Sequence, residues 1–151
     1  AELEHGEYQR VIPDTLAKDS HAVTRVVLCS GKVYYDLVEE YEKRHISDVA
    51  VVRVEQLYPF PRVDLYAELV RYPNARTVVW CQEEPMNQGA WFQIRHHLKA
   101  SISERHELHY AGRHRSPAPA TGNSNTHTRE QAALVNEALS VADLGSLPKP
   151  E

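Results

Sequence analysis

The segment Arg25-Val-Val-Leu-Cys-Ser-Gly-Lys32 is the clearest indication of secondary structure in the chain. After Arg25 the run is apolar on both faces, as expected for a parallel strand that helices cover on each side. Ser30 and Gly31 then break the run, and residues 32–45 have the apolar spacing of an amphipathic helix. The stretch therefore predicts one strand followed by one helix.

The same unit recurs along the chain. A second apolar run at 49–54 predicts another strand, and a polar loop is expected at 82–89. Further helices and strands are expected at 63–72, 76–81, 90–102 and 108–110. Repeated alternation of strands and helices with short loops favours an α/β fold of three layers, in which a small, mainly parallel sheet lies between helices.

The two ends of the chain differ from this core. Residues 1–24 lack clear periodicity and predict a linker from a preceding domain, whereas 140–151 predict a flexible tail. One α/β domain is expected between them, at 25–139. Its last helix is expected to open at Thr128, with Gln131 as the capping-box partner.

Composition argues against several classes of protein. The chain has 151 residues, of which 42% are hydrophobic and 25% charged, the balance of a globular domain. A net charge of -4 without a basic stripe argues against nucleic acid as a partner. No apolar run approaches the roughly 20 residues that span a bilayer, so no membrane is expected either. Cys29 and Cys81 each end an apolar run and are expected to be buried and reduced, which suits a reducing cytosol.

The ends of the predicted strands carry residues suited to ligand binding. Ser30 and Lys32 lie where a strand passes into a helix N-terminus, and the free N–H groups there favour an anion such as phosphate. Ser-Gly is equally an ordinary way to turn the chain and cap a helix. Arg53 is a charge inside an apolar strand, so we expect it either to be paired internally, for example with Glu55, or to bind a ligand.

Other reactive residue types favour a structural interpretation. Glu83 and Glu84 are adjacent on an extended chain, so their side chains are expected to point to opposite faces. His106-Glu-Leu-His109 has one residue too few for the zinc motif His-Glu-x-x-His, and no Gly-x-Ser-x-Gly segment is present. Trp80 is expected to pack in the core. The sequence predicts no catalytic residue and no metal ligand.

Three long strings resemble a known family. They are Leu28-Cys-Ser-Gly-Lys-Val-Tyr-Tyr-Asp-Leu37, Val51-Val-Arg-Val-Glu-Gln-Leu-Tyr-Pro-Phe-Pro61 and Cys81-Gln-Glu-Glu-Pro-Met-Asn-Gln-Gly-Ala-Trp91. Together they resemble the C-terminal domain of the E1 component of the 2-oxoglutarate dehydrogenase complex, a thiamine-diphosphate enzyme of the transketolase superfamily. The resemblance covers roughly residues 11–139. It implies a parent enzyme of the citric acid cycle that decarboxylates 2-oxoglutarate and transfers the succinyl group to the lipoyl arm of the E2 component.

The resemblance also implies where the cofactors and partners lie. In the family, thiamine diphosphate and Mg²⁺ bind between the two preceding domains, around a Gly-Asp-Gly segment that these 151 residues lack. The chain is therefore expected to hold no cofactor and to be inactive alone. Its implied partners are the remaining domains of E1, a second E1 subunit in the homodimer, and the lipoyl-bearing E2 component. The implied location is the bacterial cytoplasm, or the mitochondrial matrix in a eukaryote.

A regulatory role is implied as well, because some E1 enzymes of this family respond to acetyl-CoA or adenine nucleotides such as AMP at a site that involves this domain. The candidate residues carried over are Ser30, Lys32, Arg53 and Gln82. Three alternatives stay open at this point. The first is a stand-alone acetyl-CoA or adenine-nucleotide sensor. The second is a purely structural domain, with an exposed patch around Trp91 and Tyr110 that the rest of E1 covers. The third is part of a paralogue that acts on 2-oxoadipate.

Overall fold

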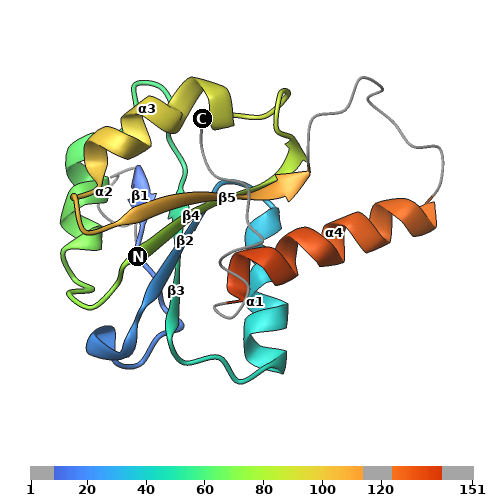
Figure 1. Cartoon of the computed structure of the whole chain (residues 1–151), viewed down its shortest axis with the longest axis horizontal. Helices are drawn as coiled ribbons and strands as arrows, with labels where there is room; N and C mark the ends of the chain where they lie inside the picture. Colours follow the sequence, from blue (N-terminus) through green and yellow to red (C-terminus); the bar gives the residue numbers. More distant parts are fainter. Residues whose placement is uncertain (1–8, 114–123, 141–151) are drawn as a thin grey trace.

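The computed structural model describes residues 9–113 and 124–140, which form the three-layer α/β fold that the sequence predicts (Figure 1). One five-stranded sheet has the order β1-β3-β2-β4-β5. Four of its strands are parallel, and the edge strand β1 is antiparallel to β3. The strands are β1 (Val11–Ile12), β2 (Arg25–Cys29), β3 (Val49–Val54), β4 (Thr77–Pro85) and β5 (Glu107–Arg113).

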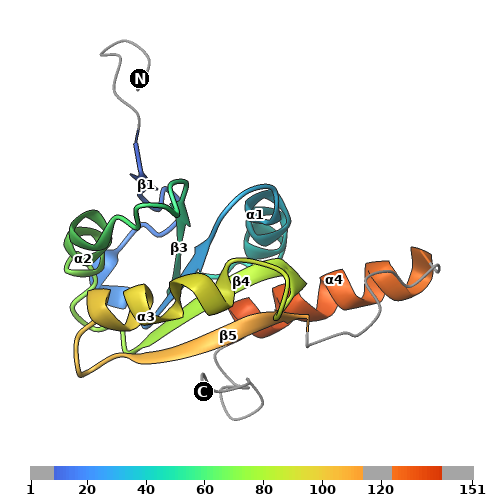
Figure 2. The ribbon, with the colours of Figure 1, turned by 90° about the horizontal axis from the view of Figure 1, so that it is seen from above.

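Two pairs of helices cover the two faces of the sheet (Figure 2). The helices are α1 (Val33–Lys43), α2 (Arg62–Leu69), α3 (Trp91–Ser101) and α4 (Ser124–Leu139), and a short 3-10 helix, η2 (Ser20–Ala22), precedes β2. Helices α2 and α3 pack on one face, whereas α1 and α4 pack on the other. None of the helices in the described ranges is long and apolar enough to cross a membrane.

Strand alternation divides the apolar residues of β2 between two cores. All five residues of β2 are buried. Val26 and Leu28 point toward α2 and α3, whereas Val27 and Cys29 point toward α1 and α4. Each fully buried Val or Leu contributes about 1.5–3 kcal/mol of transfer free energy. A strand that is apolar on both faces is therefore stable only in the central position that β2 occupies.

The range 1–24, expected as a linker, contributes the edge strand β1 to the sheet. The buried carboxylate of Asp14 accepts hydrogen bonds from the backbone N–H groups of Val51 (2.8 Å), Leu16 (3.0 Å) and Ala17 (2.7 Å). Asp14 thus accepts the backbone N–H of Val51 in β3, near the two residues of β3 that pair with β1. Residues 1–8, and residues 141–151 of the expected tail, lie outside the described residues.

Three expectations were wrong. Strand β4 continues to Pro85, through part of the expected loop 82–89, because Pro85 still lies in register with Arg113 of a β5 that is also longer than expected. Helix α4 begins at Ser124, so Thr128 lies inside the helix and is not the residue that begins it. The patch proposed around Trp91 and Tyr110 is buried, with 1% and 0% of these residues exposed.

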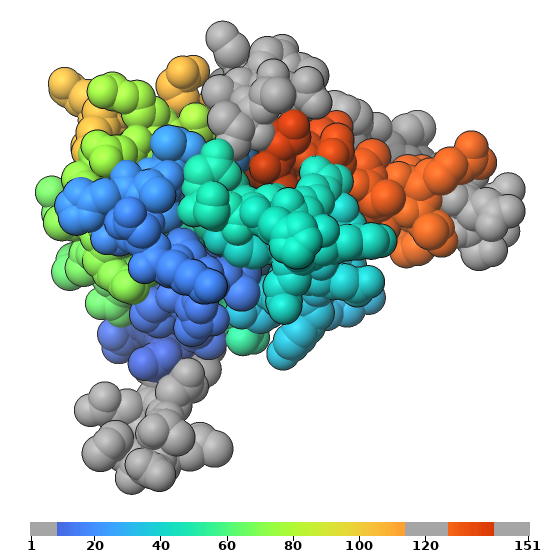
Figure 3. All heavy atoms as spheres, turned by 90° about the horizontal axis from the view of Figure 1, so that it is seen from below, coloured from blue at the N-terminus to red at the C-terminus, as the bar shows by residue number. Residues whose placement is uncertain are grey.

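Arg25 anchors the C-terminal end of α4 beneath the sheet. Its Nε donates to the backbone oxygen of Ala138 (2.7 Å) and its Nη2 to that of Glu137 (2.8 Å). Burial lowers the pKa of Arg25 to about 10, and the carboxylate of Asp48 partly offsets this effect. On the side shown in Figure 3, α1 and the residues that follow it lie between the blue part of the chain and the orange-red α4. The contact fixes the C-terminal end of α4 at the amino edge of the sheet, where β2 begins.

Candidate functional site

The predicted site residues lie at the carboxyl edge of the parallel sheet. Cys29, at the end of β2, is in register with Arg53 of β3 and Cys81 of β4. Ser30 directly follows Cys29, and Gln82 directly follows Cys81. Open α/β sheets bind ligands outside the carboxyl ends of their strands, so the edge that the sequence indicates is the one where a site is expected.

The sheet itself separates Arg53 from Gln82. Arg53 follows Val51 by two residues, so both side chains lie on the face that α1 and α4 cover. Gln82 follows Trp80 by two residues, so both lie on the face that α2 and α3 cover. The fold therefore brings Arg53 to the same side as α1, and it does not bring Gln82 and Arg53 together.

The loop after β2 presents a lysine at the start of α1. Gly31 has φ of 79°, in the left-handed region that favours glycine. Lys32 occupies the N-cap position and makes no side-chain capping bond. Its side chain is 84% exposed, and Nζ lies 3.9 Å from Oε1 of Glu83, a separation at which an exposed ion pair contributes little. Lys32 thus places a largely available cation beside the positive end of the helix macrodipole.

Arg53 is paired internally. Its Nε donates to Oε1 of Glu55 at 2.8 Å, which confirms the ion pair considered from the sequence. Its guanidinium also lies over the ring of Tyr34, 4.7 Å from the centroid, and 6.0 Å from the centroid of the Tyr35 ring. A cation in this range is attracted by the ring quadrupole. Arg53 is consequently held in place by α1, with 24% of its side chain exposed.

The side-chain amide of Gln82 makes hydrogen bonds within the fold through both its oxygen and its nitrogen. Its Oε1 accepts hydrogen bonds from Nε1 of Trp80 (2.9 Å) and the backbone N–H of Trp91 (3.1 Å). Its Nε2 donates to the backbone oxygens of Glu84 and Pro85, both at 3.1 Å. With 3% of the residue exposed, Gln82 stabilises the end of β4 and the entry to α3.

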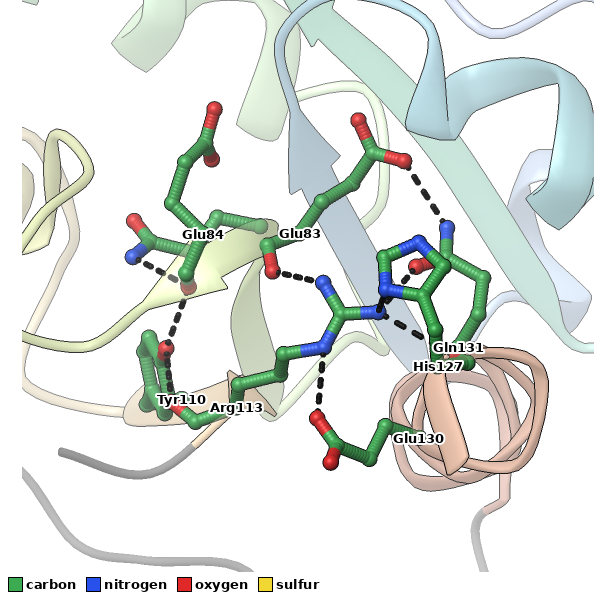
Figure 4. Close-up of polar contacts among 8 residues, drawn as sticks. Glu83, Glu84, Tyr110, Arg113, His127, Glu130 and Gln131 are labelled. Atoms are coloured by element: carbon green, nitrogen blue, oxygen red, sulfur yellow. Dashed lines mark hydrogen bonds and ion pairs between the residues drawn. The ribbon is translucent and has the colours of Figure 1, made fainter. Parts of the chain in front are cut away.

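A second set of polar residues adjoins the site, and the sequence did not reveal it. The guanidinium of Arg113 contacts α4 through Oε2 of Glu130 (2.9 Å) and Oε1 of Gln131 (3.1 Å), and it also donates to the backbone oxygen of Glu83 (Figure 4). Gln131 Nε2 in turn donates to Glu83 (2.9 Å) and to Asp36 (2.8 Å). Arg113 had no local signal in the sequence, because the strand expected at 108–110 ends before it, whereas β5 continues to Arg113.

The prediction for the adjacent acidic residues is confirmed. Glu83 points toward Gln131 on the α4 side, whereas the side chain of Glu84 points away from it and is exposed (Figure 4). The two carboxylates therefore do not form an acid–base pair.

The two cysteines are free and buried, as predicted. Burial raises the pKa of the Cys29 thiol to about 12 and that of the Cys81 thiol well above its ordinary value. Both are protonated at neutral pH and are therefore not nucleophiles. In the described part of the chain, no group of three His, Cys, Asp or Glu side chains is arranged to hold a metal ion. What the edge offers chemically is positive charge and helix N–H groups, which suit an anion.

The fold is that of an α/β domain with a mainly parallel sheet, and a solved transketolase structure shares it. A solved structure described as "Split gene transketolase, inactive beta4 tetramer" superimposes with a TM-score of 0.58 at 16% identity, over 88% of this chain and 44% of that chain. The family model described as "2-oxoglutarate dehydrogenase C-terminal" matches residues 1–139. The chain belongs to this family.

Two relatives show how similar the chain is to members of this family and how much of their length it covers. The 2-oxoglutarate dehydrogenase E1 component of Cupriavidus necator is 47% identical over 139 residues, and that of Haemophilus influenzae is 48% identical over 139 residues. Each alignment covers 92% of this chain but 15% of the relative. The chain thus spans about one seventh of the length of these relatives.

Proposed function

We propose that this chain serves as the C-terminal domain of a 2-oxoglutarate dehydrogenase E1 subunit. The parent would decarboxylate 2-oxoglutarate and pass the succinyl group to the lipoyl-bearing E2 component. The single observation that carries the proposal is the family match over 1–139, together with the 47% and 48% identity to E1 components. The domain would support the catalytic domains and the subunit interface, with no catalytic step of its own.

Thiamine diphosphate is proposed to bind in the rest of the parent, because this chain lacks the Gly-Asp-Gly segment that the family resemblance associates with its diphosphate. Its diphosphate is held through Mg²⁺, which takes carboxylate and other oxygen ligands. The described residues contain no cluster of three side chains arranged for a metal ion. We therefore derive no step of the reaction from this chain, and we assign the cofactor to the rest of the parent.

A chimeric enzyme tests the proposal. The C-terminal region of the Cupriavidus necator E1 component is replaced by residues 1–139 of this chain, and the matched control is the same enzyme truncated before that region. The chimera is expected to regain 2-oxoglutarate decarboxylation that the truncated enzyme lacks. A chimera that folds and binds thiamine diphosphate, but has no more activity than the truncated enzyme, would contradict the proposal.

The carboxyl edge is proposed to be the regulatory part of the domain, with acetyl-CoA or AMP as the ligand. Ser30 and Lys32 would bind a phosphate at the start of α1, where helix N–H groups and the exposed ammonium converge. Arg53 lies on the same side of the sheet, and Tyr34 and Tyr35 of α1 pack against its guanidinium. Aromatic rings beside a phosphate-binding lysine suit an adenine base.

Gln82 has a different part in this proposal. Because its amide is buried and satisfied by Trp80 and Trp91, it would act by fixing the end of β4 rather than by touching the ligand. The carboxylate of its neighbour Glu83 lies 3.9 Å from Nζ of Lys32. An anion that binds Lys32 would displace only a weak, exposed ion pair.

A further inference from the structure

Gln131 of α4 joins two carboxylates at the start of α1. Its Nε2 donates to Oε1 of Glu83 at 2.9 Å and to Oδ2 of Asp36 at 2.8 Å. Asp36 lies in the first turn of α1, whereas Glu83 belongs to β4. A shared donor thus holds two like charges near each other against their mutual repulsion. The proposed anion site is therefore bordered by negative charge as well as by the ammonium group of Lys32.

The carboxylate of Glu83 is held in place from several directions. Its side chain is 20% exposed, and the oxygen that accepts from Gln131 also lies 3.9 Å from Nζ of Lys32. Arg113 donates to the backbone oxygen of Glu83 and to Oε1 of Gln131 (3.1 Å), so β5 supports both members of the Glu83–Gln131 hydrogen bond (Figure 4). Glu83 is consequently a preorganised negative charge rather than a freely rotating surface carboxylate.

An anion bound to Lys32 comes within range of this charge. An oxygen that accepts a hydrogen bond from an ammonium group lies about 2.8 Å from its nitrogen. Because Nζ of Lys32 is 3.9 Å from Oε1 of Glu83, such an oxygen is at most about 7 Å from that carboxylate. This separation is shorter than the Debye length of about 8 Å at physiological ionic strength. Salt therefore screens the repulsion between Glu83 and the anion only in part.

We propose that Glu83 limits the affinity of the domain for phosphate ligands and so sets the ligand concentration at which the domain responds. The proposal rests on the proposed regulatory site at Ser30 and Lys32, and it adds a residue that opposes binding where these two favour it. The contact with Lys32 is weak, so Glu83 acts by repelling the anion rather than by occupying the lysine. Gln131 is a positioning residue, because its amide directs Glu83 toward the site.

Isothermal titration calorimetry with AMP compares two adjacent glutamates in the 151-residue chain. The phosphate of AMP carries about two negative charges at neutral pH. Glu83→Gln removes one opposing charge but keeps an oxygen that accepts from Gln131, and it is expected to lower the dissociation constant at least about fivefold. Glu84→Gln is the matched control, because it makes the same change in an exposed side chain that points away from Gln131 (Figure 4). It is expected to change the dissociation constant by less than about twofold. Circular dichroism checks that both variants are folded, and Glu83→Ala provides a second removal of the charge.

Ionic strength separates charge repulsion from a structural effect of the substitution. The ratio of the dissociation constants of the wild-type chain and Glu83→Gln should shrink as salt rises from about 0.05 M to about 0.5 M, because the Debye length falls. A ratio that does not change with salt, equal affinities of the Glu83→Gln and Glu84→Gln variants, or weaker binding by Glu83→Gln would overturn the proposal and leave the regulatory site standing. Absence of AMP binding in the wild-type chain and in all the variants would overturn the regulatory site itself, and this inference with it.

Discussion

The side-chain oxygen of Gln82 accepts the indole N–H of Trp80 at 2.9 Å, inside the core and away from solvent. The same oxygen accepts the backbone N–H of Trp91 at 3.1 Å. A single amide thus joins the end of β4 to the first residue of α3. The family resemblance implies that Gln82 belongs to a ligand site, but its hydrogen bonds within the core are enough to explain its position.

Removal of the Gln82 amide should lower the free energy of unfolding. Gln82→Ala leaves the buried N–H groups of Trp80 and Trp91 without acceptors, and we expect a loss of about 3 kcal/mol in the free energy of unfolding. Urea denaturation measures the change. Gln88→Ala, in the exposed turn after β4, is the control and should change stability by less than about 0.5 kcal/mol. Equal effects at the two positions would contradict the role assigned to Gln82.

Two glycines should differ in why they resist substitution. A Cβ at Gly112 would lie 2.5 Å from Oη of Tyr110 and 2.8 Å from the backbone oxygen of Gln82, so Gly112→Ala forces buried atoms apart. A cost of about 2–3 kcal/mol is expected. Gly31→Ala meets no atom within 4 Å but has φ of 79°, so only backbone strain of about 1 kcal/mol is expected. Thermal unfolding of both variants checks the order, and a larger loss at Gly31 would contradict it.

Arg113 should hold the first half of α4 against the sheet. Arg113→Gln removes the guanidinium contacts to Glu130 and to the backbone of Glu83. Hydrogen exchange measured by mass spectrometry should then become faster in the amino-terminal half of α4, because local opening costs less free energy. Exchange in α3, on the other face of the sheet, serves as the internal control. Unchanged exchange in α4 would show that its apolar contacts suffice.

Alkaline pH should destabilise the fold through its buried thiols. The pKa of Cys29 is raised from 9.0 to about 12 in the folded chain, mainly by burial. Between these two values the unfolded chain releases a proton that the folded chain keeps, so the stabilisation present below pH 9 is lost as the pH rises toward 12. Each such group contributes a slope of up to about 1.4 kcal/mol per pH unit.

Urea denaturation at several pH values measures this slope. Cys29→Ala removes one titrating group and should make the decline between pH 9 and 12 shallower, while leaving any dependence near neutral pH as it was. An identical alkaline slope in the variant would exclude Cys29 as a source of the decline.

The central strands were predictable because their signal is local. Residues 26–29 are apolar in unbroken succession, and such a run has few positions other than the middle of a parallel sheet. The edge strand β1 gave no such signal, because it has two residues and depends on pairing with β3. The polar extension of β4 to Pro85 similarly depends on a neighbour, β5, that lies farther along the chain.

The site was predictable in position but not in detail. Ser30 and Lys32 follow a strand directly, so their place at the carboxyl edge follows from the sequence. The role of Gln131 does not follow, because its partners Asp36 and Glu83 are distant in sequence. The partners of Gln82 are nearby in sequence, but whether its side chain meets them depends on how β4 ends and α3 begins. Side-chain alternation explains why neighbouring candidates, Gln82 and Glu83, belong to different faces.

A thermal-shift titration with acetyl-CoA and AMP tests the regulatory site most directly. A ligand at about 100 times its dissociation constant should stabilise the chain by about 2.7 kcal/mol. Lys32→Ala and Arg53→Ala should abolish the shift, whereas Lys43→Ala, an exposed lysine at the other end of α1, should retain it. We expect a rise in melting temperature that depends on Lys32 but not on Lys43. No shift with either ligand, or a shift that both lysine variants retain, would contradict it.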